Sequence, residues 1–328
     1  MMPRRLAARQ EVFPIRGAFK ISRETRTQQP VVLVEIADGD VVGRAECVPY
    51  KRYGESMDGV VETIMSVADD IAKGLDRAGL EKRLKPGAAR NGVDCALWDL
   101  EAKKAGKRVW DLAGRPAPKP VVTAFTISFD DPEKMKADAA ASADRPLLKI
   151  KLGGDGDDAR IRAVREGAPK SRLIVDPNEA WTIDHFTRFS PEFARLGVEM
   201  IEQPLPSDRD AVLATVPHPV IVCADESVHD RHHLAELKGR YEAINVKLDK
   251  AGGLTEALAL ADAARAAGFE VMVGCMLATS LAMAPAVLVA QTARWADLDG
   301  PLLLAKDREP GLVFEGSSIL PPEAALWG

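Results

Sequence analysis

The chain has 328 residues, of which 46% are hydrophobic and 28% charged, a composition typical of a soluble globular protein with a large core. Its formal net charge of -5 argues against a nucleic-acid-binding surface, and no apolar run approaches the roughly 20 residues that cross a bilayer. The four widely spaced cysteines and the lack of an apolar signal-peptide core predict a reduced, cytoplasmic protein.

The first third of the chain predicts a small α+β domain. Residues 30–48 resemble two strands joined by a turn at Asp38-Gly39. Two helical stretches follow, around 56–75 and 91–105, and Gly106 is expected to end the second. The run "GRPAPKP" at 114–120 is rich in Pro and Gly and indicates a boundary, so we place this domain at residues 1–115.

After this boundary, short apolar runs alternate with Ala-rich, charged stretches of helical character. Because strands that alternate with helices form parallel βα units, eight such runs predict a TIM-like barrel at residues 116–301 behind the smaller domain. The polar residues near the strand ends recur every 22 to 27 residues, as one repeated structural unit would require. The runs lie at 121–128, 146–153, 172–178, 199–204, 220–227, 243–250, 270–275 and 295–301.

Lys149 and Lys151 lie two residues apart in the second strand and therefore point to the same face. Repulsion between the two ammonium groups would favour a neutral Lys151 that can act as a base. The sixth strand carries Lys247, which faces the second strand across an eight-stranded ring. We therefore expect Lys151 and Lys247 to approach a bound substrate from opposite sides.

Three consecutive strands each end in one carboxylate, at Asp176, Glu202 and Asp225. One such acid usually caps a helix or is solvated, but three that converge at a barrel mouth repel each other unless a cation lies among them. Oxygen donors without His or Cys favour Mg²⁺. Two opposed lysines beside a metal-bound carboxylate indicate a racemase or epimerase, in which one lysine removes an α-proton, Mg²⁺ stabilises the enediolate, and the other lysine returns a proton.

The eighth strand carries Asp297 and Asp299, whose side chains share a face opposite the predicted metal ligands. Two carboxylates there would bind a cationic group of the substrate, such as a free α-ammonium. The alternative is that one or both cap the turn before Gly300-Pro301. At the end of the seventh strand, Met276 is expected to line the pocket.

Several motifs together resemble the enolase superfamily, muconate-lactonizing subgroup, and within it the dipeptide epimerases, over nearly the whole chain. They are "KIK" at 149–151, "VDPNEAW" at Asp176, "IEQP" at Glu202, "ADES" at Asp225 and "NVKLDKAGGL" at Lys247. The resemblance implies a modified TIM barrel of (β/α)7β type, an N-terminal α+β capping domain, and a C-terminal segment at 302–328 that returns to the cap. It also implies a Mg²⁺-dependent epimerase that inverts the C-terminal residue of L-Ala-D/L-Glu in peptidoglycan peptide recycling.

The resemblance suggests further residues around the substrate. Arginines of the two cap segments that close over the barrel mouth would meet the side-chain carboxylate of a C-terminal Glu, or else carry surface charge. One residue of the first barrel strand matches a substrate contact of the family. Apart from the resemblance, we expect two further residues to support the metal ligands and the bases from behind. The cap arginines are Arg23, Arg26 and Arg52, the substrate contact is Thr126, and the supporting residues are Asn178 and Asp249.

Two alternatives stay open beside a dipeptide epimerase. N-acylamino acid racemases and cycloisomerases share these motifs, but their substrates offer no cation to Asp297 and Asp299. A barrel that only binds a ligand would not need two opposed lysines together with three acids. We expect a small dipeptide as the partner, with no nucleic acid or membrane, and homo-oligomerisation is left open.

Overall fold

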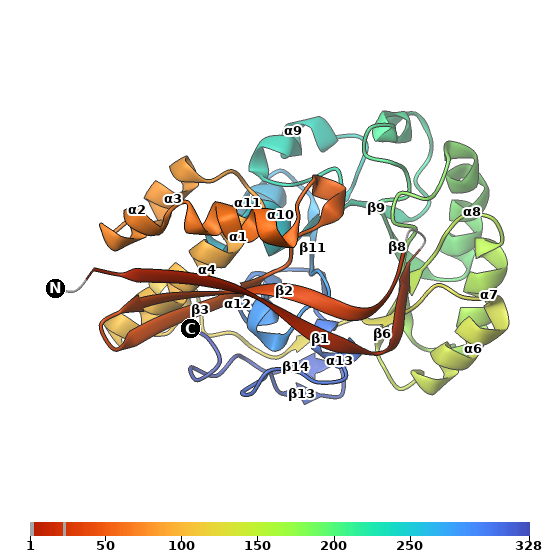
Figure 1. Ribbon diagram of the computed structural model, residues 1–328. Coiled ribbons are helices and arrows are strands. Elements are labelled where there is room, and N and C mark those ends of the chain that lie inside the picture. The colour runs from red at the N-terminus through yellow and green to blue at the C-terminus, as the bar shows by residue number, and fades with distance from the viewer. Residues whose placement is uncertain (1–2, 22–23) are drawn as a thin grey trace.

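The computed structural model describes residues 3–21 and 24–328 (Figure 1). Within this part, the N-terminal sheet has three antiparallel strands, β1 (Arg5–Ile21), β2 (Glu24–Asp38) and β3 (Val41–Cys47), in that order. The predicted turn is present, with Asp38 paired to Val41. The sequence analysis missed β1 because this strand has no regular alternation of buried and exposed residues, and its register along β2 shifts between Pro14 and Phe19.

Helices cover one side of this sheet. The helix predicted around 56–75 is two helices, α1 (Met57–Met65) and α2 (Ala68–Ala72), and α3 (Arg77–Arg83) was not predicted. The helix predicted from 91 begins earlier, as α4 (Ala88–Ala105), and ends as expected at Gly106, which has a φ of 61°. It is buried along most of its length because it lies between the sheet and the barrel. Gly43 allows the close approach, since a Cβ there would lie 2.2 Å from the Ala96 carbonyl oxygen.

The described residues confirm the predicted barrel, which follows α5 (Val109–Leu112). Eight parallel strands pair in chain order, and a bridge between Thr123 and Ala296 joins the first to the last. Each strand is shorter than its predicted run; the sixth, for example, ends at Val246. The strands are β5 (Phe125–Ile127), β6 (Leu147–Lys151), β7 (Arg172–Asp176), β8 (Val198–Glu202), β9 (Ile221–Ala224), β10 (Ala243–Val246), β11 (Glu270–Gly274) and β12 (Trp295–Asp297).

The helices between these strands form the outer wall of the barrel (Figure 1). The longer ones are α6 (Pro132–Ala141), α7 (Asp157–Gly167), α8 (Ile183–Arg195), α11 (Leu254–Ala266) and α12 (Ser280–Ala290). The shorter ones are η2 (Asp210–Thr215), η3 (Arg231–His233), α9 (Leu234–Leu237) and α10 (Leu248–Ala251), and α13 (Gly300–Leu303) follows the last strand. No helix in residues 3–21 and 24–328 is long and apolar enough to span a membrane.

The last residues of the chain lie against the N-terminal domain. A small sheet of β13 (Phe314–Glu315), β14 (Ser318–Ile319) and β4 (Val121–Val122) precedes them. Trp327 Nε1 then donates to the Cys95 carbonyl oxygen at 3.1 Å, and the Gly328 amide donates to Asp99 Oδ1 at 2.7 Å. These contacts join the C-terminus to α4.

The N-terminal sheet also reaches the mouth of the barrel. Figure 1 shows β1 running from the N-terminal end of the molecule toward the barrel, and β2 returning alongside it. At the end of β1, the carbonyl oxygen of Lys20 accepts a hydrogen bond from the Phe129 amide at 3.3 Å, and Lys20 Nζ lies 2.9 Å from Asp130 Oδ2. The N-terminal domain is therefore fixed to the segment that follows β5.

Candidate active site

One apolar residue from each strand segment fills the lower half of the barrel. The members of this set are at most 1% exposed, so they form a closed floor. They are Ala124, Leu147, Ile174, Met200, Cys223, Ala243, Met272 and Trp295.

Above this floor the barrel interior becomes polar. Because side chains two residues apart share a face of a strand, the next inward positions lie two residues later in each strand. These positions hold Thr126, Lys149, Asp176, Glu202, Asp225, Asn245, Gly274 and Asp297. Two residues further along are Lys151, Lys247, Met276 and Asp299, among others. The structure thus brings the predicted ligands, lysines and strand-eight aspartates together at the carboxyl ends of the strands.

Lys149 lies at the centre of the carboxylates. Its Nζ is 2.7 Å from Glu202 Oε2, 2.8 Å from Asp297 Oδ2 and 3.1 Å from Asp176 Oδ2, and its side chain is only 2% exposed. Burial opposes the charge of this lysine, but the three carboxylates outweigh it and raise its pKa well above the ordinary value. In this structure Lys149 therefore serves chiefly to offset buried negative charge.

The two predicted bases each contact one predicted metal ligand. Lys151 Nζ lies 2.6 Å from Asp176 Oδ2, its neighbour in register across β6 and β7, and Lys247 Nζ lies 2.7 Å from Asp225 Oδ2. Their side chains are 8% and 9% exposed, and are therefore closer to the open mouth than Lys149. Burial would lower the pKa of Lys247, but Asp225 and Glu202 outweigh it and raise it.

Sequence reasoning missed two residues that hold the carboxylates. Lys250, with a side chain 1% exposed, donates to Asp225 Oδ1 at 2.5 Å and to the Asn245 carbonyl oxygen at 3.1 Å. Asn245 Nδ2 donates to Glu202 Oε1 at 2.6 Å. Asn245 stands two residues after the apolar floor, so the period of the strand could have identified it. Lys250 lies on α10, where that period gives no signal.

The surroundings favour ionisation of two of the three acidic residues but disfavour it in the third, Glu202. Burial and the neighbouring Asp176 carboxylate raise the pKa of Glu202 to about 6. Burial would also raise the pKa of Asp176 and of Asp225, but neighbouring lysine ammonium groups outweigh this effect and hold both pKa values below the ordinary one. For Asp176, these ammonium groups belong to Lys151 and Lys149. Such a set favours positively charged partners.

The residues of this set fit a hard divalent cation. The side-chain atoms that could coordinate a metal here are all oxygens, which Mg²⁺ prefers. Among the described residues, Asn178 Oδ1, Asn245 Oδ1 and Asp297 Oδ1 are also buried without a hydrogen-bond partner. The carboxylate oxygens themselves point at lysine ammonium groups. Accordingly, no three His, Cys, Asp or Glu side chains of residues 3–21 and 24–328 are grouped around one point as ligands.

The strand-eight aspartates have different partners. Asp297 Oδ2 contacts Lys149, whereas Asp299 Oδ2 accepts a hydrogen bond from the Thr126 amide at 2.8 Å. Asp299 makes no side-chain cap for α13, which contradicts the alternative that it caps the following turn. Burial and the Asp297 carboxylate raise the pKa of Asp299 to about 7.

The remaining predicted residues lie at different distances from this cluster. The backbone amide of Asn178 donates to Asp176 Oδ1 at 2.9 Å, and Met276 is half-buried after β11. Asp249 Oδ1 instead accepts from the Val48 amide at 2.9 Å and from Asn91 Nδ2 at 2.8 Å, in the contact between barrel and cap.

Of the cap arginines, Arg23 lies outside the described residues, and Arg26 donates to Gln29 Oε1 at 3.2 Å. Arg52, in η1 (Lys51–Tyr53), donates to both carboxylate oxygens of Glu179 at 2.8 and 2.9 Å. Tyr53 packs edge-on against His229, with ring centroids 4.7 Å apart. The cap segment at 51–53 is thus attached to the loops that follow β7 and β9.

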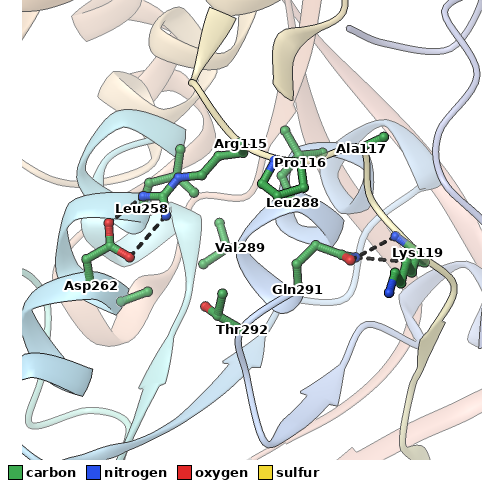
Figure 2. Close-up of a pocket in the computed structure, with 11 residues that line it drawn as sticks. Arg115, Pro116, Ala117, Lys119, Leu258, Asp262, Leu288, Val289, Gln291 and Thr292 are labelled. Atoms are coloured by element: carbon green, nitrogen blue, oxygen red, sulfur yellow. Dashed lines mark hydrogen bonds and ion pairs between the residues drawn. The ribbon is translucent and has the colours of Figure 1, made fainter. Parts of the chain in front are cut away.

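A separate pocket of about 300 Å³ lies on the outer wall of the barrel (Figure 2). The linker at 115–119 crosses α11 and α12 there, with Arg115 paired to Asp262 and Gln291 bonded to the backbone of Lys119. Its other lining residues are mostly apolar. The strand-end cluster is absent from this lining, so we assign the chemistry to the barrel mouth.

Two family models match the chain. Residues 4–114 match the mandelate racemase / muconate lactonizing enzyme N-terminal domain, and residues 134–325 match the enolase C-terminal domain-like family. The L-Ala-D/L-Glu epimerase of Escherichia coli (strain K12) is 47% identical over 93% of this chain and 96% of its own length. The N-acetyl-D-glutamate racemase of Pseudoalteromonas sp. is 41% identical over 91% of this chain and 95% of its own.

Solved structures resemble the whole chain. A crystal structure of an enolase family member from Agrobacterium tumefaciens, with homology to dipeptide epimerases and with bound sodium and L-Ala-L-Glu, has a TM-score of 0.98 and 57% identity, covering 99% of this chain and 100% of that one. The dipeptide epimerase of Enterococcus faecalis V583, complexed with Mg and L-Leu-L-Tyr, has a TM-score of 0.90 and 29% identity, covering 98% of each chain.

Proposed function

The chain belongs to the mandelate racemase / muconate lactonizing enzyme family of enolase-like proteins, and from this premise we propose that it is a Mg²⁺-dependent dipeptide epimerase acting on L-Ala-D/L-Glu. It is an isomerase of the racemase and epimerase class. The observation that carries the finer proposal is the pair of lysines, Lys151 and Lys247, on opposite strands of the barrel with three carboxylates between them.

The proposed reaction moves one proton off the α-carbon of the C-terminal residue and another onto its opposite face. One lysine, in its neutral form, accepts the α-proton, and the electron pair of the C–H bond passes into the adjacent carboxylate to give an enediolate. The other lysine, as an ammonium, returns a proton from the far side. Mg²⁺ held by Asp176, Glu202 and Asp225 would supply positive charge to the carboxylate that gains this electron pair.

The proposed position of the dipeptide follows from the charges around the mouth. Its C-terminal carboxylate would lie toward the three acids and their cation, and its α-ammonium toward Asp297 and Asp299 on the opposite wall. Asp297 Oδ1 is buried without a hydrogen-bond partner among the described residues, so a donor from the substrate would satisfy it. Thr126, through its backbone, keeps Asp299 in place for this contact.

A second candidate, an N-acylamino acid racemase, is favoured by the charge state of the strand-eight aspartates. Asp297 already has Lys149 as a cationic partner, and the raised pKa of Asp299 makes its carboxyl partly neutral near pH 7. The pair thus carries less negative charge than two free carboxylates would. The two aspartates would therefore accept an uncharged acyl group more readily than the sequence alone suggests.

Proton exchange with solvent tests the proposed function directly. The protein is incubated with Mg²⁺ and a dipeptide library in D₂O, and the products are analysed by mass spectrometry and chiral chromatography. L-Ala-L-Glu should gain one deuterium at the α-carbon of Glu and give L-Ala-D-Glu. Failure of every dipeptide to gain deuterium, with N-acetyl-glutamate exchanging instead, would favour the second candidate.

A further inference from the structure

Backbone strain is concentrated directly behind the carboxylates. Among the described residues, only Asn178, Glu179 and Gln203 are non-glycine residues with positive φ, at 48°, 67° and 32°. All three follow the ends of β7 and β8, where Asp176 and Glu202 lie. Such conformations cost free energy and persist only where surrounding contacts enforce them.

Gln203, which directly follows β8, contacts the ends of the two strands that flank it. Its backbone amide donates to the Cys223 carbonyl oxygen of β9 at 2.8 Å, and its own carbonyl oxygen accepts from the Glu179 amide after β7 at 2.9 Å. Its side-chain Oε1 accepts from the amides of Asp225 at 2.8 Å and Ser227 at 3.1 Å. One residue thus links the segments that carry Asp176, Glu202 and Asp225.

The orientation of the Gln203 amide is determined by the groups around it. Its Nε2 lies within hydrogen-bond distance of the Leu205 carbonyl oxygen, Ser227 Oγ and the Tyr241 hydroxyl, at 2.8 to 3.0 Å. A flipped amide would place a donor against the backbone amides of Asp225 and Ser227. The side chain is fully buried, and both of its polar atoms are occupied by partners within the protein.

We propose that Gln203 is a positioning residue that sets the spacing between Glu202 and Asp225 for cation binding, an inference that rests on the proposed metal-dependent function. Glu202 is its neighbour in the chain, and Asp225 is held through its amide, so movement of Gln203 displaces two of the three acids. Ligand distances in metal sites lie within about 0.2 Å of their typical values. The strained backbone at Gln203 thus lies beside one of the three acids and is bonded to a second.

The test measures Mg²⁺ affinity on chelator-treated protein by titration calorimetry, without substrate. Gln203→Met keeps the size and neutrality of the side chain but removes the acceptor for Asp225 and Ser227, so the Kd for Mg²⁺ should rise at least tenfold. Tyr241→Phe is the matched control, because it removes one partner of Nε2 and leaves Oε1 in contact with Asp225. It should lower the Tm while the Kd stays within twofold of wild type.

A second variant keeps the test decisive if Gln203→Met does not fold. Asn adopts positive φ more readily than Gln but is one methylene shorter, so Gln203→Asn should fold and still lose affinity tenfold. If wild type binds Mg²⁺ and both folded Gln203 variants bind it within twofold, the positioning role is overturned and the proposed function stands. If wild type does not bind Mg²⁺, the metal-dependent function fails and this inference fails with it.

Discussion

Lys149 Nζ lies 2.8 Å from Asp297 Oδ2, so the second strand of the barrel is joined to the eighth across its interior. The same ammonium contacts Glu202 and Asp176, and it therefore connects the three acids to the strand-eight aspartates. Sequence reasoning assigned Lys149 to repel Lys151. The structure adds three acidic neighbours, which make Lys149 a shared counter-charge for both halves of the site.

Removal of divalent metal should abolish activity, because the neighbouring lysine ammonium groups are already paired with the acids and leave no positive charge for the carboxylate of the substrate. We expect chelator-treated protein to lose at least about 100-fold in kcat and to recover it with Mg²⁺. Asp225→Asn should show the same loss without recovery. Full activity after exhaustive chelation would contradict the assignment of Asp176, Glu202 and Asp225.

Replacement of either opposed lysine should separate exchange from inversion. In Lys151→Ala or Lys247→Ala, net epimerization should fall below detection because one face of the α-carbon loses its proton carrier. Each variant should still exchange the α-proton of one epimer with D₂O, and the two variants should select opposite epimers. Epimerization at the wild-type rate by either variant would show that the two-base assignment is wrong.

Acetylation of the substrate amine tests the strand-eight aspartates. Wild type should prefer L-Ala-L-Glu over its N-acetyl analogue by at least tenfold in kcat/KM, about 1.4 kcal/mol, because acetylation removes the cation. Asp297→Asn/Asp299→Asn should barely distinguish the two. Equal use of both substrates by wild type would instead support an N-acylamino acid racemase.

Asp249 should make the stability of the protein pH-dependent. Burial raises its pKa from 3.8 to about 7, so the folded protein holds a proton that the unfolded chain releases between these values. The stability from this group is present below about pH 4 and is lost as pH rises through about 7. Asn keeps an oxygen for Val48 and Asn91 without the charge, so Asp249→Asn should be more stable than wild type at pH 8, by on the order of 1–3 kcal/mol.

Urea unfolding of wild type and Asp249→Asn at pH 4 and pH 8 checks this prediction. The difference between the two proteins should be small at pH 4, because the wild-type carboxyl is protonated in the folded state and only about half ionised in the unfolded chain. An equal difference at both pH values would show that the effect comes from packing and not from ionisation.

Much of the fold and site was predictable because both depend on local periodicity. Parallel βα units bring all strand carboxyl ends to one edge, and the two-residue period of a strand determines which side chains face inward. The positions of Lys149, Asp176, Glu202, Asp225 and Asp297 follow from these two rules alone. The long strand β1 did not follow from them, because its irregular pattern is stabilised by pairing along β2.

Only the tertiary structure decided which groups contact each other. Lys250 meets Asp225 because α10 begins directly after β10, and Asp249, one residue earlier, turns instead toward Val48 and Asn91 of the cap. The Gln203 side chain reaches Asp225 only with its backbone in a left-handed conformation that no local propensity favours. Such contacts join residues far apart in the chain, so they are set by long-range packing and by the need to partner every buried polar group.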